Sequence, residues 1–162
     1  MPCFLWFQSF LYLSEQSFFL QKVQALRPVF PFQTECLMSY KTAWTKQCVF
    51  VCYSGNCTET EVLNAVIELQ SDYRFDSTYR ALHDFSLCQS MSGAPEHLEE
   101  LAARNIGAAA SNANLKIAVV AKIPDVLAML KRFEMLALSP YPLRVFETAE
   151  HALAWLDCTA SD

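Results

Sequence analysis

Between residues 39 and 157, short apolar segments alternate with longer segments in which apolar residues recur every three or four positions. The short segments predict strands, and the periodic segments predict amphipathic helices. The predicted strands are Tyr40–Thr45, Cys48–Ser54, Ser77–Phe85, Leu115–Ala121 and Leu143–Phe146. Only Lys46 and Gln47 separate the first two strands, so these two are expected to form an antiparallel hairpin.

A helix is predicted after each of the last four strands. Thr58 and Glu61 form a T-x-x-E capping box, Pro95 and Pro124 suit a first helical turn, and Thr148 suits a cap. The expected buried positions are Val62, Val66, Leu69, Leu98, Leu101, Ala102, Ile106, Val126, Leu127, Leu130, Phe133, Ala149, Ala152, Leu153 and Leu156. This order predicts an α/β fold with a mixed, mostly parallel sheet, an N-terminal β-hairpin and four helices on its faces.

Residues 1–37 differ from the remainder, because they hold nine of the 21 aromatic residues and only four charged ones. Three interpretations stay open: an extra helix packed on the domain or on a partner subunit, a poor signal or anchor, or upstream sequence that is not translated. In the last case Met38 is the true start. The expected organisation is therefore an N-terminal extension over residues 1–37 and one domain over residues 38–158.

Composition narrows the classes of function. The chain is 53% apolar and 18% charged, which excludes a disordered protein. Its net charge is -5 and its basic residues are dispersed, so no nucleic-acid partner is expected. No apolar run approaches the roughly 18 residues of a membrane-spanning helix, so no membrane insertion is expected.

The seven cysteines are odd in number and irregular in spacing. Because no convincing secretion signal is present, we expect a cytoplasmic protein whose cysteines are reduced thiols. Cys48, Cys52 and Cys57 resemble a metal trio, but no second cysteine pair follows, so we expect buried small hydrophobes and no metal. No phosphate-binding or dinucleotide motif occurs among the three glycines, so no cofactor is expected.

A chain turn is predicted at Gly55–Cys57, and a long loop at Asp84–Ala94. The loop leaves the carboxyl end of a strand, which is where open α/β sheets bind ligands, and it exceeds the usual two to six residues. The candidate ligand- or partner-binding residues are Asp84, Ser86, Cys88, Ser90 and Ser92, ahead of a helix N-terminus that favours anions. The alternative is a solvated loop whose serines cap backbone groups.

An enzymatic alternative uses Cys88 and His83 as a thiol- or hydrolase-type pair. Adjacent strand residues point to opposite faces, so His83 and Asp84 are not expected to aim at one substrate. No G-x-S-x-G motif accompanies them. A non-enzymatic domain is therefore the leading prediction.

Three segments resemble the SpoIIAA-like group of STAS/SEC14-type small bacterial domains, over about residues 38–157. They are "MSYKTAW…CVFVCYSGNCTETEVLNAV", "LKIAVVAKIPDVLAMLKRFEML" and "YPLRVFETAEHALAWL". The resemblance implies the α/β sandwich of anti-sigma-factor antagonists, which is usually cytoplasmic and non-enzymatic. It further implies a regulatory domain that acts through a protein partner or an apolar, lipid-like ligand, and we expect a homodimer.

The resemblance also points to a phosphoacceptor. In the phosphorylated STAS regulators a serine lies in an Asp-Ser-Ser/Ala-Gly motif after the third strand. The candidates here are Ser86 and Ser92. Phe85 separates Asp84 from Ser86, and Ser92-Gly93 lacks the aspartate, so the match to a kinase-regulated switch is incomplete.

Overall fold

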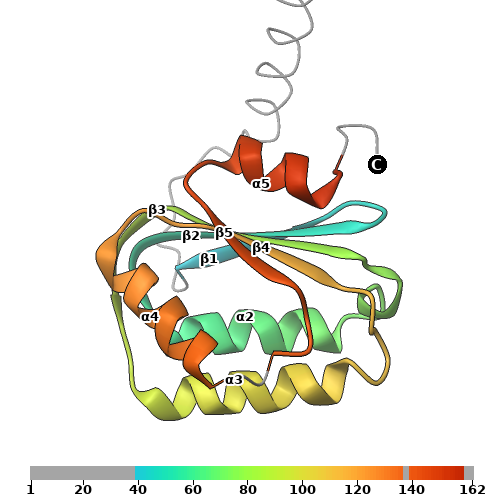
Figure 1. The fold of residues 1–162 in the computed structure, drawn as a ribbon, viewed down its shortest axis with the longest axis horizontal. Coiled ribbons are helices and arrows are strands. Elements are labelled where there is room, and N and C mark those ends of the chain that lie inside the picture. The colour runs from blue at the N-terminus through green and yellow to red at the C-terminus, as the bar shows by residue number, and fades with distance from the viewer. Residues whose placement is uncertain (1–38, 137–138, 159–162) are drawn as a thin grey trace, which may run out of the picture. The chain divides into compact units, whose positions relative to one another are not determined.

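The computed structural model describes residues 39–136 and 139–158, which form a five-stranded sheet covered by helices on both faces (Figure 1). The strands are β1 (Tyr40–Trp44), β2 (Cys48–Thr58), β3 (Arg80–Ser92), β4 (Lys116–Val120) and β5 (Leu143–Phe146). They lie side by side in chain order. The β1–β2 pair is antiparallel and the other three pairs are parallel, which confirms the mixed sheet with an opening hairpin.

The helices are α2 (Glu59–Ser71), α3 (Pro95–Ala108), α4 (Pro124–Met135) and α5 (Ala149–Leu156). Figure 1 shows α2, α3 and α4 on one face of the sheet, which we call the cavity face, and α5 on the other. Most predicted core positions are buried, but Ile106 and Leu127 are exposed, which corrects the prediction. The buried stripe of α3 continues instead through Asn105, seven residues after Leu98, and that of α4 through Met129, three residues after Val126.

Strands β2 and β3 are longer than predicted. The expected turn Gly55–Cys57 and most of the expected loop Asp84–Ala94 are strand, and the pairing of β2 with β3 runs to Thr58 opposite Ser92. Two irregularities interrupt the ladder, and Gly55 supplies the positive φ of 73° beside one of them. Serine-rich sequence favours loops locally, but strand pairing overrides that preference here.

The start of β3 is also corrected. Phe75–Ser77 form a 3-10 helix, η1, and the strand begins at Arg80 rather than at Ser77. Asn112, which is buried, donates to the carbonyl groups of Phe75 and Thr78 at 2.8 and 2.7 Å. These bonds satisfy the carbonyl groups of the non-strand segment and hold it against the end of α3.

One cysteine pair is oxidised. The structure joins Cys48, at the start of β2, to Cys158, just after α5, across 110 residues of sequence. This disulfide corrects the expectation of reduced thiols for these two residues, which cysteine spacing alone could not pair. Cys52 is free and exposed, whereas Cys57 and Cys88 are free and buried.

The last helix packs on the sheet by its C-terminal end. Arg80 donates a hydrogen bond to the carbonyl of Leu156, and the cations of Lys116 and Arg144 lie 5.9 and 5.6 Å from the centre of the Trp155 ring. Positive charge next to a helix C-terminus complements the helix dipole. These contacts therefore anchor α5 to the sheet. Within the described residues, no helix has the length and apolar character needed to cross a membrane.

The predicted capping box begins α2. The Thr58 hydroxyl accepts from the Glu61 amide at 3.2 Å, and the Glu61 carboxylate accepts from the Thr58 amide at 2.8 Å. We expect Thr58→Ala to lower the free energy of unfolding by about 1 kcal/mol, as loss of an N-cap does elsewhere. Urea unfolding measures the change. Thr60→Ala, on the exposed side of the same turn, is the control, and an equal loss in both variants would contradict the capping role.

Gly93 leaves the space that the Glu59 side chain occupies. A Cβ atom at Gly93 would lie 2.4 Å from Cβ and 2.5 Å from Cγ of Glu59, which is only 1% exposed. Overpacking of this kind costs about 1–3 kcal/mol, so we expect Gly93→Ala to destabilise the domain by about 2 kcal/mol in urea unfolding.

Gly107→Ala is the matched control, because a Cβ atom added at this position in α3 would meet nothing within 4 Å. Alanine favours a helix interior over glycine, so this variant should be neutral or more stable by about 0.5 kcal/mol. Equal destabilisation by both substitutions would contradict the steric explanation.

Candidate functional site

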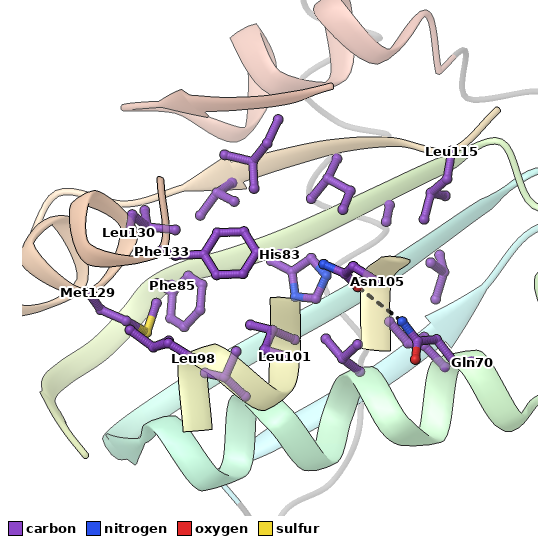
Figure 2. A pocket seen from close by; sticks show the side chains of 18 of the residues that line it. Gln70, His83, Phe85, Leu98, Leu101, Asn105, Leu115, Met129, Leu130 and Phe133 are labelled. Carbon is purple, nitrogen blue, oxygen red and sulfur yellow. Dashed lines mark hydrogen bonds between the residues drawn. The ribbon is translucent and has the colours of Figure 1, made fainter. Parts of the chain in front are cut away.

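A cavity of about 70 Å³ lies between the cavity face of the sheet and helices α2, α3 and α4 (Figure 2). Its walls are mainly apolar and include Val66, Leu101, Met129 and Phe133. Native cores seldom contain voids larger than a water molecule, so a cavity of this size is a feature to explain. Its position under the sheet makes it a candidate site for a small apolar ligand.

Three polar side chains also line the cavity: His83 from β3, Gln70 from α2 and Asn105 from α3. The Gln70 amide donates to the Asn105 carbonyl oxygen at 3.0 Å, drawn as the dashed line in Figure 2. No charged side chain is among the described residues that line the cavity. The site therefore favours uncharged molecules.

His83 is held by a buried aromatic group. Its Nδ1 lies 3.1 Å from the hydroxyl of Tyr53, whose ring stacks on Phe85 at a centroid distance of 4.1 Å. Burial lowers the pKa of His83 to about 4. The imidazole is therefore neutral at physiological pH and is not poised as a general base near pH 7.

A second hollow, of about 320 Å³, lies where β3 separates from β4; we call it the end cleft. The pairing of β3 with β4 ends at Asp84 opposite Val120, whereas β3 continues beside β2 to Ser92. The end cleft is lined by Phe85, Ser86, Val120, Lys122, Glu147 and Thr148, among others. It therefore collects polar groups from the carboxyl ends of β4 and β5 and from β3 just beyond its pairing with β4, close to where ligands meet α/β sheets.

The predicted site residues are not brought together in one place. Ser86, which is exposed, lies in the end cleft, and both its amide, at 2.8 Å, and its hydroxyl donate to the Asp84 carboxylate. Cys88 is buried and donates to the Ser90 carbonyl at 3.1 Å. Ser90 donates to Asn56 at 2.8 Å.

Ser92 pairs with β2 at the far end of β3, where its side chain is exposed. Of the two candidate phosphoacceptors, only Ser86 lies in the end cleft.

The enzymatic alternative receives no support from the contacts. The hydrogen-bond partner of His83 is Tyr53, whereas that of Cys88 is the Ser90 carbonyl. Burial raises the pKa of the neighbouring Cys57 thiol to about 12, and the Cys88 thiol beside it adds to this shift. Cys57 is therefore held protonated and is a poor nucleophile.

The cysteine trio considered as a metal site is separated by the fold. Cys48 is bonded to Cys158, Cys52 is exposed and Cys57 is buried. Among residues 39–136 and 139–158, no three His, Cys, Asp or Glu side chains are grouped so that they could hold a metal ion.

Sequence reasoning missed five residues of these two sites. They are Lys122 and Glu147 in the end cleft, and Tyr53, Gln70 and Asn105 around the cavity. The first two follow predicted strands directly, so the rule that placed Ser86 at a carboxyl end could have found them. The partners of His83 and Asn105 depend on packing between distant segments, for which the sequence carries no signal.

Comparison with protein-family models gives no match, and comparison with curated proteins gives none either. Two solved structures are similar. One is an uncharacterized protein from the DUF3478 family with a SpoIIAA-like fold from Shewanella loihica PV-4, which is 14% identical over 77% of this chain and 99% of its own, at a TM-score of 0.49.

The other solved structure is the anti-sigma factor antagonist SpoIIAA in its unphosphorylated form. It is 12% identical over 74% of this chain and 99% of its own, at a TM-score of 0.50. At this identity the likeness concerns the fold alone. Together with the strand order and the helix placement, it shows that the described residues adopt the SpoIIAA-like, or STAS-like, α/β fold.

Proposed function

We propose that this domain is a non-enzymatic regulatory module that binds a protein partner at the end cleft. The end cleft carries the proposal, because it joins the half-buried apolar side chains of Ile123 and Ala149 to the polar groups of Ser86, Lys122 and Glu147. A rim of opposite charges around an apolar centre is suited to a protein segment. The name of SpoIIAA describes a protein that acts on another protein, which agrees with this choice.

The form of β3 gives further support. From Phe85 to Ser92 the strand is paired with β2 and, among the described strands, no longer with β4. Within this segment Leu87 is 67% exposed. An exposed large apolar residue on a strand that has left its neighbour is a usual place for a partner chain to contact a sheet.

Affinity purification from the native host tests this proposal. The tagged wild-type chain is compared with Ser86→Arg, which fills the end cleft, and with Ser71→Arg, which adds the same charge and bulk at the exposed end of α2. We expect mass spectrometry to identify a protein retained by the wild type and by Ser71→Arg and lost with Ser86→Arg. Equal retention by all three would overturn the placement of the partner in the end cleft.

A second candidate function rests on the cavity under the sheet. Its apolar walls around a neutral histidine favour a small apolar ligand, which would act alone or regulate partner binding. Native mass spectrometry of protein from its own host checks for such a molecule and for a homodimer in one measurement. A strictly monomeric mass without an adduct would count against both.

We further propose that residues 38–158 form this binding domain and that residues 1–37, which lie outside the described residues, are an extension to it. Mass spectrometry of the intact native protein distinguishes the three interpretations of the extension. A mass that begins at Met1 would remove the interpretation in which translation starts at Met38.

A further inference from the structure

The bond between Tyr53 and His83 determines which nitrogen of the imidazole carries the proton. Tyr53 is fully buried, and the His83 Nδ1 is the hydrogen-bond partner of its hydroxyl among the described residues. If Nδ1 were the donor, the hydroxyl hydrogen of Tyr53 would be buried without an acceptor, which is costly. Tyr53 therefore donates and Nδ1 accepts, and a neutral imidazole then carries its single proton on Nε2.

The Nε2–H group of His83 is a donor that the described residues leave unused. His83 is 7% exposed and lines the cavity, and its Nε2 has no acceptor among the described residues. In Figure 2 the ring of His83 lies among the apolar side chains of the cavity, with Phe133 on one side and Asn105 on the other. Nε2 is not among the fully buried, unpartnered atoms of the described residues, so it is open to the cavity, where a guest or a water can accept from it.

The surroundings restrict what the acceptor can be. The charged groups that a buried anion requires are absent from the described lining, and burying an unpaired charge is far more costly than burying a neutral polar group. The volume of about 70 Å³ is roughly half that of the engineered cavity of about 150 Å³ that admits benzene. The guest therefore has few heavy atoms and no charge.

We propose that the cavity binds a small apolar molecule with one uncharged acceptor oxygen, of the ketone, aldehyde, ether or alcohol class, and that this oxygen accepts from His83 Nε2. The proposal rests on the second candidate function, a ligand in the cavity, and names the chemistry of that ligand. A buried water on the same donor is the competing occupant, because the volume exceeds the 10–15 Å³ that one water requires.

Two probes of the same shape test the proposal on the full chain: 2-butanone, and 2-methyl-1-butene, in which a CH₂ group replaces the oxygen. Nuclear magnetic resonance follows the shifts of the cavity side chains and of the His83 ring nitrogens. We expect 2-butanone to bind roughly two- to tenfold more tightly than the alkene, because one net hydrogen bond changes a dissociation constant by about that factor. The Nε2 signal should be that of a protonated nitrogen and should shift with 2-butanone only.

His83→Phe removes the donor and should bind both probes with equal affinity. Tyr53→Phe is the second variant, because it releases Nδ1 and lets the proton move to it, so the preference for 2-butanone should fall.

Equal binding of both probes to the wild type would overturn the proposal while leaving the cavity as an apolar site. An Nε2 signal that reports a bound water which neither probe displaces would also overturn it. If neither probe shifts any cavity resonance, the second candidate function itself fails.

Discussion

Arg132→Met is expected to destabilise the domain by about 3 kcal/mol. Arg132 of α4 donates to the carboxylate of Glu59 at the start of α2, whose side chain is 0% exposed. The second oxygen of that carboxylate is buried and has no hydrogen-bond partner among the described residues. Removal of the arginine therefore leaves a buried charge without compensation, which costs about 3–5 kcal/mol in other proteins. Methionine keeps the unbranched stem and the helix propensity of the site.

The double variant Glu59→Gln/Arg132→Met separates the charge from the packing. It removes both charges, so most of the lost stability should return, as it does when buried ion pairs are replaced in full. The surface pair of Arg104 with Glu100 is the control, because both side chains are more than 40% exposed and Arg104→Met should change stability by less than about 1 kcal/mol. Urea unfolding measures all four chains. A double variant no more stable than Arg132→Met alone would contradict the account.

Acidification from pH 7 to pH 5 is expected to lower the free energy of unfolding by about 2 kcal/mol through His83. Burial depresses the pKa of His83 to about 4, below its usual value of about 6.5. Between these two values the unfolded chain binds a proton that the folded chain does not, so stability falls as the pH falls. The change begins near pH 6.5 and levels off below pH 4.

The carboxyl groups change their protonation, and with it their effect on stability, at a lower pH than the histidines. Burial alone would raise the pKa of Glu61, but hydrogen bonds from the Ser39 amide and from the amide and hydroxyl of Thr58 outweigh it and hold this pKa below its usual value, so the contribution of Glu61 to stability is lost only at lower pH. The window from pH 7 to pH 5 therefore isolates the histidines. His83→Phe should remove the slope in that window, whereas His97→Gln, a change at a half-buried surface site, should keep it. An unchanged slope in His83→Phe would contradict the assignment.

The order and type of the elements could be predicted, because they depend on local patterns. The capping box of Thr58 and the prolines at Pro95 and Pro124 mark helix starts that the structure confirms. The length of β2 and β3 was missed, since serine and glycine suggest turns until a neighbouring strand satisfies their backbone groups. The exposure of Ile106 and Leu127 was also missed, because the sequence does not distinguish an apolar residue inside a buried stripe from one beside it.

The sites were predictable in part. The rule for carboxyl ends of strands led to Ser86, which lies in the end cleft, but it also selected Cys88 and Ser92, which do not line that cleft. The environment of His83 was out of reach, because Tyr53 is 30 residues away and its contact depends on the register of β2 against β3. The disulfide between Cys48 and Cys158 has the same origin in tertiary structure.

The binding of a protein at the end cleft is tested most directly by the affinity of the purified partner for two charge-reversal variants. Lys122→Glu places a second negative charge beside Glu147 in the end cleft, whereas Lys131→Glu makes the same change in charge on the exposed side of α4. A partner complementary to the end cleft places acidic or acceptor groups opposite Lys122, and like charges opposed across an interface cost several kcal/mol, so we expect Lys122→Glu to weaken binding about tenfold or more and Lys131→Glu to leave it within about twofold. Equal dissociation constants for the two variants would contradict the account.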